Sequence, residues 1–195
     1  MTDVSEIEKI VQERLSEPRF LHTLGVAKEA VRLSEKWGAD KPSAYLAGLV
    51  HDFAKEIPKD EAIKKLREFG ETGFDYSACP SLIHGPLGAR LALQELGIEN
   101  SSVLDAIRYH TTGRQGMTLL EKIIYLADFI EPSRKFDGVQ KVRKLAYEDI
   151  DRAILLEADM VIGFVLERGQ FLHEETVQMR NELLIKTKEE EKNEG

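Results

Sequence analysis

The sequence predicts an all-α protein that consists of one domain. Apolar residues recur at helical spacing along most of the chain, and no stretch shows the alternating pattern of a half-buried strand. The length of 195 residues suits one domain with a sizeable core, and 42% of the residues are apolar. We expect the domain to cover residues 1–187 and the charged residues 188–195 to form a frayed tail.

The first two helices are predicted over residues 3–15 and 19–37. Each segment carries an apolar stripe along one side, which is typical of a helix that packs on a core. Pro18 separates the two segments, and Gly38 ends the second one. His22 therefore lies in the first turns of the second helix.

The next segment starts at Asp40 and Pro42 and is almost entirely apolar over residues 44–50, which fits a buried helix or a short buried strand. It ends with His51 and Asp52 side by side. A neutral imidazole beside a carboxylate at the end of a buried segment is costly unless something binds both groups. A metal ion would do so, and a histidine hydrogen-bonded to a carboxylate within the core is the alternative.

The middle of the chain predicts a charged surface helix, a loop and two apolar helices: residues 59–69, 70–80, 84–97 and 101–110. Ser101 or Ser102 is expected to cap the last of these helices. His84 then lies at a helix start and His110 at a helix end.

Residues 111–116 form a polar, glycine-containing loop with Arg114, which fits either a phosphate contact or an ordinary connection between helices. Residues 119–130 predict a second buried helix. Asp128 lies within this apolar run, where an aspartate almost never occurs without a partner. Three more helices are predicted after it: residues 139–146, 150–166 and 174–186.

Six residues punctuate these apolar helices: His22, His51, Asp52, His84, His110 and Asp128. Taken singly, each histidine fits a core or surface position. Taken together, imidazoles and carboxylates are a ligand set that suits Fe, Mn, Zn, Ni or Co better than calcium. Because Cys79 is the only cysteine, a cysteine-rich structural zinc site is excluded.

Charge and cysteine content narrow the class of protein further. The 27 basic and 35 acidic residues give a net charge of -8, which argues against sequence-independent binding to nucleic acid but allows a small anionic substrate. No window approaches the length of a membrane span, and no apolar signal region follows the N-terminus. A single cysteine agrees with a reducing compartment, so we expect a cytoplasmic protein.

Five sequence stretches resemble the HD-domain metal-dependent phosphohydrolases, and in particular the YqeK branch of bacterial symmetrical diadenosine tetraphosphate hydrolases. They are Arg19–Val26 (RFLHTLGV), His51–Glu56 (HDFAKE), Ile83–Pro86 (IHGP), Tyr109–Arg114 (YHTTGR) and Tyr125–Pro132 (YLADFIEP). The resemblance runs from about residue 19 to residue 181. It implies a helical HD-domain bundle, with a metal core over about 19–132 and C-terminal helices over 138–187.

The resemblance also implies roles for the six residues. His22, His51, Asp52 and Asp128 match the ligands of a first metal, while His84 and His110 match positions that hold a second metal or contact a substrate phosphate. Iron, as one or two ions per chain, is the metal associated with the family, and other divalent transition metals remain open. The implied reaction is attack of a metal-bound hydroxide on phosphorus, which splits diadenosine tetraphosphate into two ADP.

Basic side chains near the metal are expected to hold the charge of the phosphates. Lys55 follows Asp52 by three residues and is assigned a catalytic role together with it, although a solvated surface lysine is the alternative. The other expected substrate contacts are Arg19, Thr111, Arg114, Arg134, His173 and Thr176. His173 could contact a nucleobase or cap the last helix, and Glu174 stands where the family usually has proline.

Two other functions remain open on the sequence alone. The chain could be a phosphohydrolase of another nucleotide or deoxynucleotide, because the metal core is shared across the HD superfamily. It could also be a nucleotide-binding sensor that has no turnover. We expect a small-molecule dinucleoside polyphosphate or nucleotide as ligand, no nucleic acid, no membrane, and a homodimer as a possible assembly.

Overall fold

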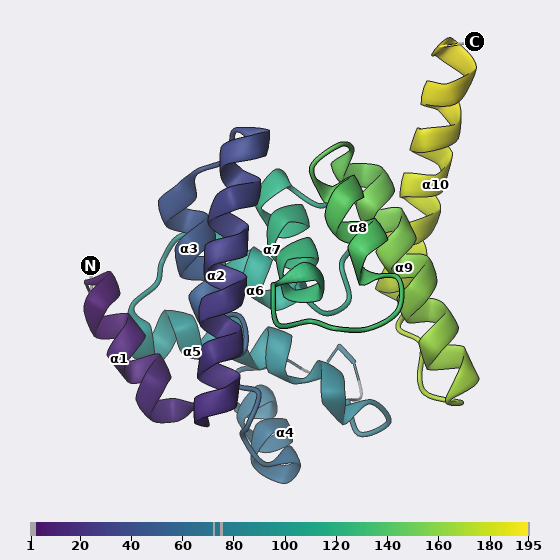
Figure 1. Ribbon diagram of the computed structural model, residues 1–195. Coiled ribbons are helices and arrows are strands. Elements are labelled where there is room, and N and C mark those ends of the chain that lie inside the picture. Colours follow the sequence, from purple (N-terminus) through teal and green to yellow (C-terminus); the bar gives the residue numbers. More distant parts are fainter. Residues whose placement is uncertain (1–2, 72, 75, 195) are drawn as a thin grey trace.

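The computed structural model describes residues 3–71, 73–74 and 76–194 (Figure 1). Within these ranges the chain forms the following helices in order: α1 Val4–Arg14, α2 Glu17–Trp37, α3 Lys41–Val50, α4 Lys59–Glu68, the 3-10 helix η1 Pro80–Leu82, α5 His84–Leu96, α6 Ser101–Tyr109, α7 Leu119–Ile130, α8 Val139–Ala146, α9 Ile150–Glu167 and α10 Glu174–Glu194. The described residues contain no strand, so the all-α prediction is confirmed. None of these helices is long and apolar enough to cross a lipid bilayer.

Polar side chains fix the N-termini of several helices. The residue before each of these helices accepts a hydrogen bond from a backbone N–H in the first turn, as Asp40, Asn100, Thr118 and Asp149 do. The cap of α6 is therefore Asn100, not Ser101 or Ser102 as the sequence predicted. The apolar segment before His51 is helix α3, not a strand.

Two predicted boundaries differ from the structure. Pro18 lies in the first turn of α2 instead of separating two helices, because proline lacks an N–H that would have no helical partner there. The charged stretch that we predicted to fray from residue 188 is helical as far as Glu194. Glutamate and lysine are strong helix formers, and Arg152 of α9 forms an ion pair with Glu191 (3.1 Å).

The core lies between α2, α3, α5, α6 and α7, which pack against one another in one body (Figure 1). Helix α3 approaches α2 closely at Gly48, where a Cβ atom would lie only 2.7 Å from the Cα atom of Ala27. This contact requires glycine, and it brings the C-terminal end of α3 against α2. Helices α8, α9 and α10 follow on one side, and α10 extends beyond the body at its C-terminal end (Figure 1).

Candidate metal centre

The structure brings all six predicted metal-site residues together at the inner ends of five helices. His51 and His110 directly follow α3 and α6, and His84 is the first residue of α5. Asp52 is at the centre of the cluster. Its Oδ1 atom lies 3.3 Å from His84 Nε2 and 3.8 Å from His110 Nε2, while its Oδ2 atom lies 3.4 Å from His51 Nε2.

His22 and Asp128 complete the cluster from α2 and α7. The Nε2 atom of His22 lies 3.0 Å from Asp128 Oδ1 and 3.9 Å from Asp52 Oδ2. His51 Nε2 lies 3.9 Å from the same Asp128 oxygen. Because Asp52 and Asp128 both face His22 and His51, these four residues surround one point between the helix ends.

Every imidazole of the cluster points its Nε2 atom inward, because its Nδ1–H is used elsewhere. The Nδ1 atoms of His51, His84 and His110 each lie 2.7 Å from a backbone carbonyl oxygen, those of Gly48, Ser81 and Ile107. His22 Nδ1 instead donates to the carboxylate of Glu131 (3.0 Å). A proton on Nδ1 leaves the Nε2 lone pair free as a metal ligand.

The inner face of the cluster fits a divalent metal. His84 Nε2 and His110 Nε2 lie 3.0 Å apart, and neither carries a proton because each Nδ1–H is donated to a carbonyl oxygen. His51 Nε2 is buried with no hydrogen-bond partner. The cluster contains two sets of three residues whose potential ligand atoms lie within 4.8 Å of one another inside each set. The sets are His22, His51 and Asp128, and His51, Asp52 and His110. A cation bound among these atoms would relieve the repulsion and use the unpaired nitrogen.

Burial and neighbouring charges shift the pKa values of several groups in the cluster. Burial, with the positive charge of Lys55, holds the pKa of His84 well below its ordinary value, and burial lowers the pKa of His110 to about 4. Burial alone would raise the pKa of Asp52, but attraction to His51, His84 and Lys55 outweighs it and holds that pKa well below the ordinary value. Neutral His84 and His110 thus face an ionised Asp52. Burial alone would lower the pKa of His51, but attraction to Asp52 and Asp128 outweighs it and raises that pKa.

Three basic side chains surround the opening of the cluster. Arg19 donates to Asp52 (2.9 Å), Arg134 donates to Asp128 (2.6 Å), and Lys55 Nζ donates to His84 Nε2 (3.1 Å). About a third of each basic side chain is exposed, with values of 32%, 35% and 34%. They can therefore reach both the cluster and an anion that enters from solvent.

Arg114 lies apart from these basic residues. It donates to the buried carboxylate of Glu121 (2.7 and 2.8 Å), and it forms an ion pair with Asp105 (3.3 Å). Glu121 is only 1% exposed and requires a cationic partner. The structure therefore does not place Arg114 with the cluster, and the alternative of an ordinary helix connection describes this loop better.

Comparison with known proteins agrees with this geometry. Residues 19–133 match the family model described as HD domain, a span that contains all six cluster residues. The chain belongs to the HD domain family. The resemblance that the five motifs predicted is confirmed, and HD domains of this kind are metal-dependent hydrolases.

Several relatives of this HD domain protein carry the same name, "bis(5'-nucleosyl)-tetraphosphatase, symmetrical". The Bacillus subtilis relative is 43% identical over 160 residues, which cover 82% of this chain and 86% of the relative. The Halalkalibacterium halodurans relative is 42% identical over 180 residues, which cover 92% of this chain and 96% of the relative. A crystal structure of a "predicted HD superfamily hydrolase involved in NAD metabolism" from Clostridium acetobutylicum is 43% identical, superimposes with a TM-score of 0.93, and covers 95% of this chain and 99% of that one.

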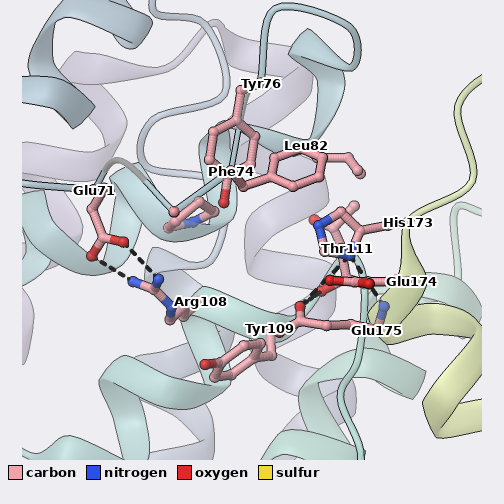
Figure 2. A pocket seen from close by; sticks show the side chains of 13 residues that line it. Glu71, Phe74, Tyr76, Leu82, Arg108, Tyr109, Thr111, His173, Glu174 and Glu175 are labelled. Atoms are coloured by element: carbon pink, nitrogen blue, oxygen red, sulfur yellow. Dashed lines mark hydrogen bonds and ion pairs between the residues drawn. The ribbon is translucent and has the colours of Figure 1, made fainter.

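A second feature of this HD domain is a cavity of about 200 Å³ beside the cluster, which we call the aromatic cavity (Figure 2). Its lining residues come from the loop before α5, the end of α6 and the start of α10: Glu71, Gly73, Phe74, Tyr76, Leu82, Pro86, Arg108, Tyr109, Thr111, Thr112, His173, Glu174 and Glu175. Thr111 joins cavity and cluster. Its Oγ1 atom lies 3.2 Å from His84 Nε2 and 3.1 Å from His110 Nε2.

His173 lies at the wall of the aromatic cavity and also contacts the last helix. Its ring centroid is 4.6 Å from that of Phe74, and its Nδ1 accepts a hydrogen bond from the N–H of Glu175 in the first turn of α10 (3.3 Å). Both roles considered for His173 are therefore compatible with its position. Thr176 is 4% exposed and donates to the carbonyl of Thr112 (2.8 Å), so it ties α10 to the cavity wall and does not itself line the cavity.

Sequence reasoning missed two groups of residues around these sites. Phe74 and Tyr76 are half-buried and line the cavity from a loop. The glycine and proline residues of this loop predicted a connection but not which side chains face inward. The ion pair between Glu71 and Arg108, visible in Figure 2, fixes the start of that loop at 2.7 and 2.8 Å. Glu131, the partner of His22, stands in the last of the five family motifs, and its position directly after an apolar run was the signal for it.

Proposed function

We propose that this protein hydrolyses dinucleoside tetraphosphates symmetrically, with diadenosine tetraphosphate giving two ADP. The observation that carries the proposal is the cluster of four histidines and two aspartates with three basic side chains at its opening. The names of the relatives, which are 34–43% identical over most of the chain, point to the same reaction.

Within this proposal, His22, His51, Asp52 and Asp128 hold one divalent metal. His84 and His110 either share a second metal with Asp52 or contact the substrate phosphate. When bound, the metal supplies a water of lowered pKa and a counter-charge for phosphate oxygens. We propose iron as this metal, as one or two ions per chain.

The residues of this chain then divide the remaining work. Arg19, Lys55 and Arg134 hold the anionic tetraphosphate against the cluster and offset the charge that moves to the leaving ADP. Each of them is fixed by a carboxylate or imidazole of the cluster, so its position is set before substrate binds. Preorganised charge of this kind costs little reorganisation during the reaction.

The aromatic cavity supports a nucleoside as the other half of the substrate. Phe74 and Tyr76 offer faces for a base to stack on. The charge of Arg108 is matched by Glu71, so the carboxylates of Glu174 and Glu175 give the rest of the lining a negative charge, and Glu175 accepts a hydrogen bond from the Thr112 hydroxyl (3.3 Å). Such a cavity repels phosphate but accepts hydrogen bonds from the amino group of adenine, so phosphates belong at the cluster and the base in the cavity.

The test uses the full chain purified without oxygen. Bound metals are measured by elemental analysis, diadenosine tetraphosphate is added in water enriched in oxygen-18, and the products are separated by ion exchange. We expect two ADP per substrate, with one labelled oxygen in one of the two. ATP together with AMP would contradict the symmetrical reaction. Untouched substrate with metal present would favour hydrolysis of another nucleotide, and tight ADP binding without turnover would favour a sensor.

A further inference from the structure

The Nδ1 atoms of the four histidines in the cluster do not all have the same kind of hydrogen-bond partner. His51, His84 and His110 donate their Nδ1–H to neutral backbone carbonyl oxygens. His22 alone donates to a carboxylate, that of Glu131, at 3.0 Å. The histidine with the charged partner is thus the one whose Nε2 atom lies 3.0 Å from Asp128 Oδ1 in the cluster.

Glu131 is itself held in one place. It is 1% exposed, and its two carboxylate oxygens accept hydrogen bonds from the hydroxyl and the backbone N–H of Ser133, the latter at 2.7 Å. The turn that contains it is clamped by Arg143, which donates to the carbonyl oxygens of Ile130 (2.7 Å), Glu131 (2.7 Å) and Arg134 (2.9 Å). The carboxylate therefore meets His22 from a rigid segment.

Helix α2 makes room for this carboxylate. Gly25 lies one turn after His22, and a Cβ atom there would be only 2.8 Å from Glu131 Oε2. Glycine inside a helix costs about 1 kcal/mol relative to alanine. The helix that carries His22 thus lacks a side chain at the point where Glu131 reaches it.

We propose that Glu131 is the positioning residue of His22, which fixes the direction of the Nε2 lone pair and makes this imidazole the most electron-rich histidine ligand of the metal. Carboxylates bound to the outer nitrogen of a ligating histidine fix its tautomer and raise its basicity. The inference rests on the proposed metal site but not on the proposed substrate. A purely structural role, in which Glu131 only holds the turn after α7, is the competing explanation.

The test compares two isosteric variants of the full chain with Co²⁺ as the probe. Glu131→Gln removes the charge beside His22. Glu121→Gln is the matched control, because Glu121 is equally buried, in the helix that Glu131 directly follows, but receives its hydrogen bonds from Arg114 and Thr118. Chelator competition gives the Kd for Co²⁺, the visible absorption bands report the ligand field, and thermal unfolding gives Tm.

We expect Glu131→Gln to bind Co²⁺ about 10 to 100 times more weakly, with shifted absorption bands. Glu121→Gln should lower Tm but keep the wild-type Kd and bands. An unchanged Kd and spectrum in Glu131→Gln, or an equal loss in Glu121→Gln, would overturn the inference. A wild-type chain that binds no Co²⁺ would overturn the proposed metal site and this inference with it.

A second variant covers the case in which Glu131→Gln does not fold. Gly25→Ala improves the helix propensity of α2 but places a methyl group against Glu131 Oε2. We expect this variant to fold and to bind Co²⁺ more weakly than the wild-type chain. Wild-type Co²⁺ affinity in folded Gly25→Ala would count against the positioning role.

Discussion

The metal cluster and the aromatic cavity lie side by side but are built in opposite ways. The cluster takes its side chains from the ends of core helices, and His51 is completely buried. The cavity is lined mainly by loops, by the end of α6 and by the first turn of α10. Basic residues surround the opening of the cluster, whereas the carboxylates of Glu174 and Glu175 line the cavity.

Under the proposed function, the two regions handle different parts of one substrate. A rigid, buried set of ligands suits a reaction in which atoms must be held within fractions of an ångström. A loop-built wall of aromatic and acidic side chains suits recognition of a base, where stacking tolerates small shifts. Thr111 is the contact between the two regions, so changes on either side of it should affect different kinetic constants.

The largest effect is expected at the centre of the cluster. Asp52→Ala removes the carboxylate that faces His51, His84 and His110, so metal binding and hydrolysis should be lost together, with kcat/KM lower by about 10³-fold or more. Elemental analysis and a hydrolysis assay on the same sample measure both. Full metal content in this variant would break the assignment of Asp52 as a ligand.

A smaller effect is expected at Lys55, which touches the cluster without being a metal ligand. Lys55→Ala should keep the bound metal and lower kcat by about 10²-fold, because one fixed charge on the phosphates is lost. Lys41→Ala, which removes an exposed lysine paired with Glu35, is the matched control and should leave kcat unchanged. A wild-type kcat in the Lys55 variant would place that side chain outside the reaction.

Substitutions in the aromatic cavity should weaken substrate binding and leave the chemical step unchanged. His173→Ala is expected to raise KM by about 10-fold, the typical result of losing one aromatic contact with a base, while metal content stays the same. Phe136→Ala changes an aromatic residue that does not line the cavity and serves as control. Loss of metal in the His173 variant would show that the two regions are not independent.

The smallest effect is expected where the cavity loop is anchored. Hydrogen bonds from Arg108 and Arg90 outweigh partial burial and lower the pKa of Glu71 to about 2. Because this folded pKa is below the ordinary value of 4.5, the ionised group stabilises the fold above about pH 4.5 and loses that effect as the pH falls towards 2.

Glu71→Gln should therefore lower Tm by about 2–4 °C at pH 7, for a loss of about 1 kcal/mol. The difference from the wild-type chain should shrink as the pH is lowered from 6 to 3. Thermal unfolding followed by circular dichroism at several pH values measures this change. A difference that grows at low pH would mean that Glu71 is not held in its ionised form.

Much of the cluster could be predicted from sequence because helix periodicity and ligand chemistry act locally. His84 and His110 interrupt apolar runs at helix ends, and packing of the apolar faces brings such ends together. The family motifs sharpened this prediction by assigning four of the six residues, as a hypothesis, to a first metal. Glu131 was missed as a partner because α2 and the turn after α7 are far apart in the sequence, and no sequence pattern indicates a hydrogen bond between them.

The cavity and the last helix were harder to predict for a different reason. Phe74 and Tyr76 lie in a loop, where no periodicity indicates which side chains face inward. Arg114 was assigned to the substrate from the polarity of its loop, but the buried Glu121 competes for it. Residues 188–193 are exposed, as a solvated tail would be, but they continue α10 as a helix, where Glu191 contacts Arg152.

The histidines that follow α3 and α6 also act as helix caps. The last carbonyl groups of a helix have no partner within it, and His51 and His110 supply one through Nδ1–H to Gly48 and Ile107. A cation on the opposite nitrogen would immobilise these rings and thereby the final turns of both helices. Because metal binding and local opening are thermodynamically linked, amide hydrogen exchange at these two helix termini should slow as more of the protein binds metal.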